Sequence, residues 1–101
     1  THLADENCPP APKKEDYGYT SQIRRSALSI SANITEAFGR HHTNDKVNFY
    51  YYSRGSVTET GSHLEYGLRV GYIEKEKFES LEKQLNSIRF ELNKIIKTIR
   101  N

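Results

Sequence analysis

The chain has 101 residues, of which 35% are hydrophobic and 28% are charged, and its formal net charge is +2. These values predict one small soluble domain with a modest core, whose stability we expect self-association to support. The single cysteine excludes an intramolecular disulfide. No segment approaches the roughly 18 consecutive apolar residues of a membrane span, and no signal peptide is visible, so we expect a cytoplasmic protein. The small net charge allows sequence-independent nucleic-acid binding without requiring it.

Residues 1–16 are predicted to be a linker or N-terminal extension, and residues 17–101 the folded domain. Pro9, Pro10 and Pro12 preclude a continuous helix there and favour extended backbone. The segment holds four acidic residues against two lysines, so the rest of the chain has a net charge of +4. Because the chain contains no methionine, we expect it to be processed, trimmed or incomplete.

A first amphipathic helix is predicted from about Thr20 to Phe38. Thr20 can cap the first backbone amides, and Gly39 can supply the left-handed residue that ends a helix at low cost. At 100° per residue, one apolar stripe of this helix faces the core. The stripe consists of Ile23, Ala27, Ile30, Ile34 and Phe38. Leu28 lies off the stripe and is either an ordinary exposed leucine or a subunit contact.

A second helix is predicted to begin near Asn44 or Asp45, either of which can cap it, and to stop at Gly71. Small residues recur at every seventh position of its core stripe, so a neighbouring helix can approach closely there. The core stripe consists of Phe49, Ser53, Val57, Thr60, Leu64, Gly67 and Leu68. A second stripe, roughly 120° away, consists of Tyr52, Glu59, Tyr66 and Val70. Two such faces predict two neighbours, which are the bundle interior and another subunit.

The last predicted helix has the most regular apolar pattern in the chain. Its apolar residues alternate steps of three and four, which is the spacing of left-handed knobs-into-holes packing. They are Phe78, Leu81, Leu85, Ile88, Leu92, Ile95 and Ile99. We interpret this pattern as packing rather than as a cofactor site. Phe90 points away from it, toward several lysines, and is either a contact residue or an isolated exposed aromatic.

Six basic residues on the first two helices and the turn between them are candidate phosphate ligands, and His42 clusters with those at the turn. They are Arg24, Arg25, Arg40, His41, Lys46 and Arg54. The alternative is structural and is the more common outcome, because arginines in helical bundles often pair with carboxylates such as Glu36 or Glu59. Basic residues at a helix C-terminus are also favoured by the helix dipole alone.

Three consecutive tyrosines, Tyr50, Tyr51 and Tyr52, fan out around the second helix and cannot all stack on bases. Tyr51 is predicted to be the most exposed. Proteins that bind single strands combine aromatic platforms with basic grooves, so Tyr51 is the candidate for base stacking.

The residue pattern predicts neither an enzyme, nor a metal site, nor a cofactor. His41 and His42 are adjacent and His63 lies on the next helix, without the spacing that lets two histidines on one helix bind a metal. Cys8 has no base or cationic helix end beside it that would activate its thiol. No acid–base pair or nucleophile stands out among the remaining residues.

The residue order from Tyr17 to Ile73 resembles the 23S rRNA intervening-sequence proteins, a family of four-helix bundles whose relatives include accessory proteins of diversity-generating retroelements. The matching positions are Tyr17, Gly18, Thr20, Ser21, Gln22, Ile23, Arg24, Arg25, Ala27, Ile30, Asn33, Ile34, Glu36, Phe38, Gly39, Arg40, Phe49, Arg54, Gly55, Ser56, Glu59, Leu64, Gly71 and Tyr72. The resemblance implies an all-α, antiparallel up-and-down bundle. We predict three long helices in the sequence and expect the first helix of the family to be missing. We expect the resulting apolar groove to be filled by the proline-containing segment, an upstream helix or a neighbouring chain.

The resemblance also implies a homo-oligomer, with a homopentamer as the specific prediction. We predict that Leu28, Tyr52, Glu59, Tyr66 and Val70 form its interface. The implied function is that of a non-enzymatic accessory protein that binds RNA or a nucleic-acid-handling partner such as a reverse transcriptase. The alternative is a structural or protein-interaction scaffold with no nucleic-acid role.

Overall fold

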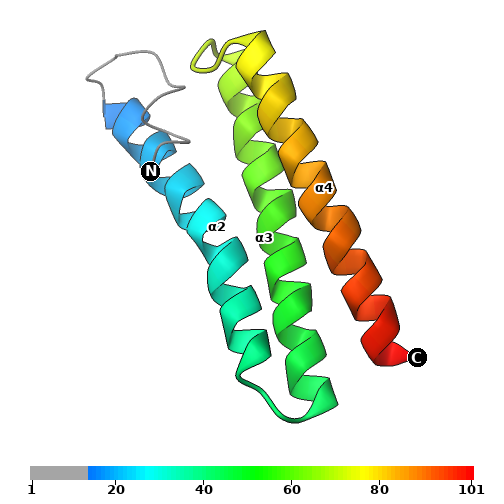
Figure 1. Cartoon of the computed structure of the whole chain (residues 1–101). Helices are drawn as coiled ribbons and strands as arrows, with labels where there is room; N and C mark the ends of the chain where they lie inside the picture. The colour runs from blue at the N-terminus through cyan, green and yellow to red at the C-terminus, as the bar shows by residue number, and fades with distance from the viewer. Residues whose placement is uncertain (1–13) are drawn as a thin grey trace.

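Three long helices, placed side by side, make up the part of the chain that this computed structural model describes, which is residues 14–101. They are α2 (Lys14–Phe38), α3 (Thr43–Arg69) and α4 (Lys75–Arg100). Figure 1 shows that successive helices run in opposite directions and that α3 lies between the other two. The all-α prediction is confirmed for these residues. Residues 1–13, which include Cys8 and the three prolines, lie outside the described part.

Helix α2 begins earlier than the sequence pattern suggested. It starts at Lys14, so Thr20 lies inside the helix and the prediction that it caps the first turn is wrong. Pro12 is the last proline of the N-terminal segment, so no proline prevents the helix from extending back to Lys14. Lys14–Asp16 therefore belong to α2, whereas the function of the preceding residues as a linker stays a prediction.

Helix α2 ends without a left-handed glycine, so the role predicted for Gly39 is wrong. The last turn tightens instead, and the Gly39 amide donates to the Glu36 carbonyl at 3.1 Å. The side chain of Lys46 then reaches back from α3, and its Nζ donates to the Ala37 carbonyl at 2.8 Å. Because a lysine from the next helix binds an end carbonyl of α2, the backbone does not need a positive φ.

Helix α3 starts slightly before its predicted caps and ends as predicted. His42 occupies the N-cap position in extended conformation, without a side-chain hydrogen bond to the helix. Asn44 and Asp45 lie in the first turn, where the carboxylate favours the positive end of the dipole without capping it. At the other end, Gly71 has a φ of +84°, a conformation that glycine adopts without strain.

Close approach of α2 and α3 occurs along the small residues of the predicted seven-residue repeat. Ser53 Oγ donates to the carbonyl of Ile30 at 2.8 Å, and the Thr60 and Ser26 hydroxyl oxygens lie 2.9 Å apart. Gly67 faces a buried tyrosine ring of α2. All three small residues are buried, so the predicted close packing is confirmed.

The predicted core stripes are confirmed for most positions. The buried apolar residues are Tyr19, Ile23, Ile30, Ala37, Val47, Tyr50, Val57, Leu64, Ile73, Phe78, Leu81, Leu85, Leu92 and Ile96. Phe38 is a clear error, because its side chain is 74% exposed and Ala37 is buried beside it. In α4, Ile96 is buried although the predicted stripe omitted it. Ile88, Ile95 and Ile99 are only partly covered.

This partial burial has a simple cause in the arrangement of the helices. Helix α3 packs extensively against both neighbours, whereas no packing of comparable extent joins α2 and α4 among the described residues. An apolar hollow of about 240 Å³ therefore lies between α2 and α4, with α3 as its floor. Its lining residues are Ala27, Ile30, Ser31, Thr60, Leu64, Leu81, Gln84, Leu85 and Ile88. We call this hollow the α2–α4 groove. The predicted groove is confirmed.

Candidate nucleic-acid interface

Three of the predicted phosphate ligands make local structural contacts. Arg25 Nη2 lies 2.5 Å from Glu59 Oε2, and Arg40 Nη2 lies 3.0 Å from Glu36 Oε1. Lys46 binds the end of α2 as described above. Each of these three positive charges therefore has a carboxylate or carbonyl partner, as the structural alternative expects, whereas phosphate binding by them stays a prediction.

The structure distributes the six predicted ligands over three places. Arg24 and Arg25 lie on α2, and Arg40, His41 and Lys46 lie at or beside the α2–α3 turn. Arg54 is separate from both groups, because it lies on the flank of α3 that packs against α4. The predicted set therefore does not form one continuous cluster.

Arg54 belongs to a group of side chains at the boundary between α3 and α4. Its Nη1 donates to Asn93 Oδ1 at 2.8 Å, and its guanidinium group lies over the ring of Tyr51, 5.0 Å from the centroid. Arg100, in the last turn of α4, donates from Nη1 to the hydroxyl oxygen of Tyr51. Two arginines from different helices therefore contact the same tyrosine.

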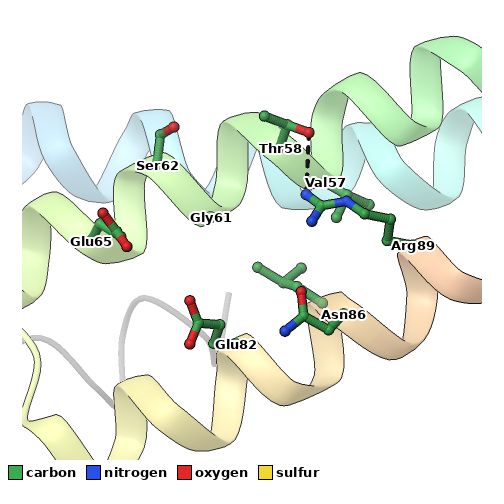
Figure 2. Close-up of a pocket in the computed structure, with 9 residues that line it drawn as sticks. Val57, Thr58, Gly61, Ser62, Glu65, Glu82, Asn86 and Arg89 are labelled. Atoms are coloured by element: carbon green, nitrogen blue, oxygen red, sulfur yellow. Dashed lines mark hydrogen bonds between the residues drawn. The ribbon is translucent and has the colours of Figure 1, made fainter.

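A third arginine, Arg89, continues this line along α4 and bounds a cavity. Its Nη2 donates to Thr58 Oγ1 at 3.2 Å, as the dashed line in Figure 2 marks. The cavity beside it has a volume of about 220 Å³, and Gly61 leaves room for it on α3. Figure 2 shows Glu65 and Glu82 on the side of the cavity away from Arg89.

We call Arg54, Arg89 and Arg100 the arginine row. Within the described residues, none of the three forms an ion pair with a carboxylate, because their partners are an amide, a phenol and a hydroxyl group. Sequence reasoning missed Arg89 and Arg100. The usable signal was their spacing with Asn93, since steps of four and seven residues put all three on one flank of α4.

Charge is unevenly distributed along the bundle. Figure 1 shows that the α2–α3 turn and the C-terminus of α4 lie at the same end. The half of the bundle at this end, residues 27–56 and 89–101, has seven basic side chains against three acidic ones, a net charge of +4. The other half, residues 17–26 and 57–88, has six of each. We call the first half the basic half.

The tyrosine predictions are partly wrong. Tyr50 is buried and Tyr52 is 57% exposed, whereas Tyr51, predicted to be the most exposed, is half-buried. The reason is that Tyr51 faces the α4 side, where Arg54 and Arg100 contact it. Its ring therefore holds two arginines in place instead of standing free for a base.

The predicted interface residues fall on two different surfaces. Tyr52, Tyr66 and Val70 are exposed on the outer side of α3, and Glu59 between them pairs with Arg25. Leu28 is also exposed, but helical periodicity turns it about 140° from the buried Ile23 and therefore away from α3. Leu28 and the three α3 residues cannot form one continuous patch on a single chain.

The described residues contain no group of three or more His, Cys, Asp or Glu side chains arranged to hold a metal ion. His63 Nε2 lies 3.5 Å from Glu59 Oε2, which brings together only two side chains of the kind that bind metals. None of the helices in residues 14–101 is long and apolar enough to cross a membrane.

Comparison with known proteins identifies the family. The family model described as 23S rRNA-intervening sequence protein matches residues 6–94. The chain belongs to this family. A crystal structure of a protein of the S23 ribosomal protein family from Bacteroides thetaiotaomicron, whose function is unknown, is similar at 35% identity and a TM-score of 0.77. The similarity covers 78% of this chain and 73% of that one.

No curated protein matches the chain. Membership of the 23S rRNA-intervening sequence proteins confirms the family part of the resemblance. The connection to diversity-generating retroelements stays a prediction. The same holds for the absence of enzymatic activity and for the interface residues.

Proposed function

We propose that this member of the family is a non-enzymatic, oligomeric accessory protein that binds RNA in the cytoplasm. The observation that supports this proposal is the basic half, which contains the whole net charge of residues 17–101. Clustered positive charge raises the local concentration of polyanions and speeds their association. The rest of the bundle is neutral, so one end of the molecule faces the RNA.

The proposal is tested by titrating the protein with a single-stranded RNA at several salt concentrations between about 50 and 200 mM. Contacts with three or four phosphates would give a slope of log K against log salt of roughly −2 to −3, because each contact releases counterions. Failure to bind at the lowest salt concentration, or an affinity that does not change with salt, would contradict RNA binding through the basic half.

The partner could also be a protein that handles nucleic acid, such as a reverse transcriptase. A gene for a reverse transcriptase next to the gene for this chain would support a retroelement accessory protein. An rRNA gene in that position would support an rRNA insertion. Recruitment by a reverse transcriptase without RNA, and unaffected by salt, would place recognition on apolar surfaces and not on the basic half.

The same proposal includes a four-helix bundle and a homo-oligomer, with a pentamer as the specific expectation. The α2–α4 groove supports a fourth helix, because its lining is apolar and comes from all three helices, like the surface that the remaining helix of such a bundle covers. The exposed Tyr52, Tyr66 and Val70 support a subunit contact on α3. The second candidate function, a protein-interaction scaffold, rests on these same apolar surfaces.

A further inference from the structure

We infer that the arginine row, and not the α2–α3 turn, is where the chain contacts the phosphate backbone of RNA. This inference rests on the proposed function and names its site. Arg54, Arg89 and Arg100 lie along the α3–α4 boundary within the basic half.

The partners distinguish this row from the other paired arginines. Arg25, Arg40 and Arg69 each lie within 4.0 Å of a glutamate oxygen, so a phosphate must compete with a carboxylate for them. The members of the row donate to neutral oxygens, and no carboxylate of residues 14–101 compensates their charge by a contact. A guanidinium group has five N–H donors, so one bond to a neutral oxygen leaves donors for a bidentate phosphate contact.

The alignment suits a linear polyanion. Asn93, which holds Arg54, follows Arg89 by four residues on α4, an axial distance of about 6 Å. Arg54 and Arg100 both contact Tyr51, so the third guanidinium group lies next along the same boundary. Each arginine is held by the opposite helix. This arrangement reduces the side-chain entropy that is lost when a phosphate binds.

The charges at the two ends of the arginine row indicate which way a bound strand would run. Glu65 and Glu82 lie beyond Arg89, at the far side of the 220 Å³ cavity in Figure 2, and would repel a phosphate. At the other end, residues 89–101 have four basic side chains against one acidic one. A bound strand therefore runs from Arg89 toward the C-terminus of α4 and away from the two glutamates.

The test compares two triple variants that remove the same charge. One variant is Arg54→Gln/Arg89→Gln/Arg100→Gln, and its matched control is Arg25→Gln/Arg40→Gln/Arg69→Gln. Both lose three positive charges. The first loses arginines of the basic half with neutral partners, whereas the control loses glutamate-paired arginines, of which only Arg40 lies in the basic half. In RNA titrations we expect the row variant to bind about a hundredfold more weakly, with a salt slope shallower by about 2. We expect the control to stay within about fivefold of the wild type, since its arginines are already paired.

A third variant, Arg54→Lys/Arg89→Lys/Arg100→Lys, keeps the charge but removes the planar fork of donors. We expect an intermediate loss of affinity for this variant, because lysine binds phosphate as a point charge. Circular dichroism of all three variants separates lost binding from lost structure. If the glutamine variant unfolds, the lysine variant still tests the row, and wild-type affinity in it would overturn the proposal.

The remaining outcomes separate this inference from the proposed function. If the wild type binds RNA and the two glutamine variants lose affinity equally, net charge alone matters and the row is not the site. If the wild type binds no RNA, the proposed function itself fails, and this inference with it. Titration with polyglutamate of similar length is the last arm. If the row variant weakens polyglutamate binding as much as it weakens RNA binding, the arginine row recognises acidic proteins, and the RNA assignment is overturned.

Discussion

Gly67 is the glycine with the least room for a side chain, at a point where α2 packs on α3. A Cβ atom at this position would lie 2.2 Å from Tyr19 Oη and 3.0 Å from Ile73 Cδ1. Tyr19 cannot move aside without loss, because its hydroxyl donates to the carbonyl of His63 at 2.7 Å and its ring is buried. The absence of a side chain at Gly67 therefore allows this tyrosine to cross from α2 to α3.

We expect Gly67→Ala to lower the free energy of unfolding by about 1–2 kcal/mol, because overpacking outweighs the gain in helix propensity. The matched control is Gly61→Ala in the same helix, where the nearest atom would be Leu85 Cδ1 at 4.0 Å. This control should be neutral or stabilising by up to about 1 kcal/mol. Urea denaturation measures both variants. Equal stabilities for the two would show that Tyr19 yields without cost.

Local sequence patterns correctly predicted the packing of residues that lie between two neighbouring helices. The repeat that includes Ser53, Thr60 and Gly67 identified the close approach, because seven residues return to the same face of a helix. The arginine row was not accessible in this way. Arg54 finds its partner 39 positions along the chain at Asn93, and no local rule indicates which of several arginines meets a glutamate and which meets an amide.

At the scale of elements, α4 shows how far an apolar pattern predicts packing. The pattern predicted the buried side of this helix, and Leu81, Leu85 and Leu92 are buried as expected. It could not indicate how many neighbours the helix has. Ile88, which lines the α2–α4 groove, and Ile95 have the right spacing for a core but are only partly covered. Phe38 of α2 was misplaced for the same reason, because helix spacing says nothing of what covers a stripe.

The proposed fourth helix gives Ile88 a measurable role. If a helix covers the groove, Ile88→Asp should lower the free energy of unfolding by about 3 kcal/mol or more, because it removes buried apolar surface and buries a charge. The control is Phe90→Asp in the same helix, where the side chain is 62% exposed and lies near Lys94. This control should stay within about 0.5 kcal/mol of the wild type. Thermal unfolding provides the comparison, and small effects in both variants would mean that the groove is open to water.

At the scale of the whole molecule, self-association through the exposed tyrosines would strengthen RNA binding by the basic half. In a closed cyclic assembly every subunit has the same orientation relative to the axis, so all basic halves face the same end. The net charge of +4 is then multiplied by the number of subunits on one surface. RNA that spans several subunits would gain affinity through effective concentration, without any additional kind of contact. Oligomerisation and RNA binding therefore belong to the same proposal.

The interface on α3 can be tested independently of RNA. Tyr52 and Tyr66 are 57% and 52% exposed, yet each packs against another ring, Phe49 at 5.5 Å and Tyr19 at 5.9 Å between centroids. Such supported aromatic surfaces are enriched at protein interfaces. We expect Tyr52→Glu/Tyr66→Glu to reduce the sedimenting mass toward that of one chain, since like charges would face each other across a symmetric contact.

The matched control for this variant is Tyr17→Glu/Phe90→Glu, which replaces two exposed aromatic residues outside the predicted interface and adds the same charge. We expect this control to keep the wild-type mass, because Tyr17 lies near the start of α2 and Phe90 lies on α4, both away from Tyr52. Circular dichroism should show helical content unchanged in both variants. If both dissociate, added charge alone weakens the assembly. If neither does, the subunits meet elsewhere, and Leu28 on the opposite surface of α2 becomes the next position to replace.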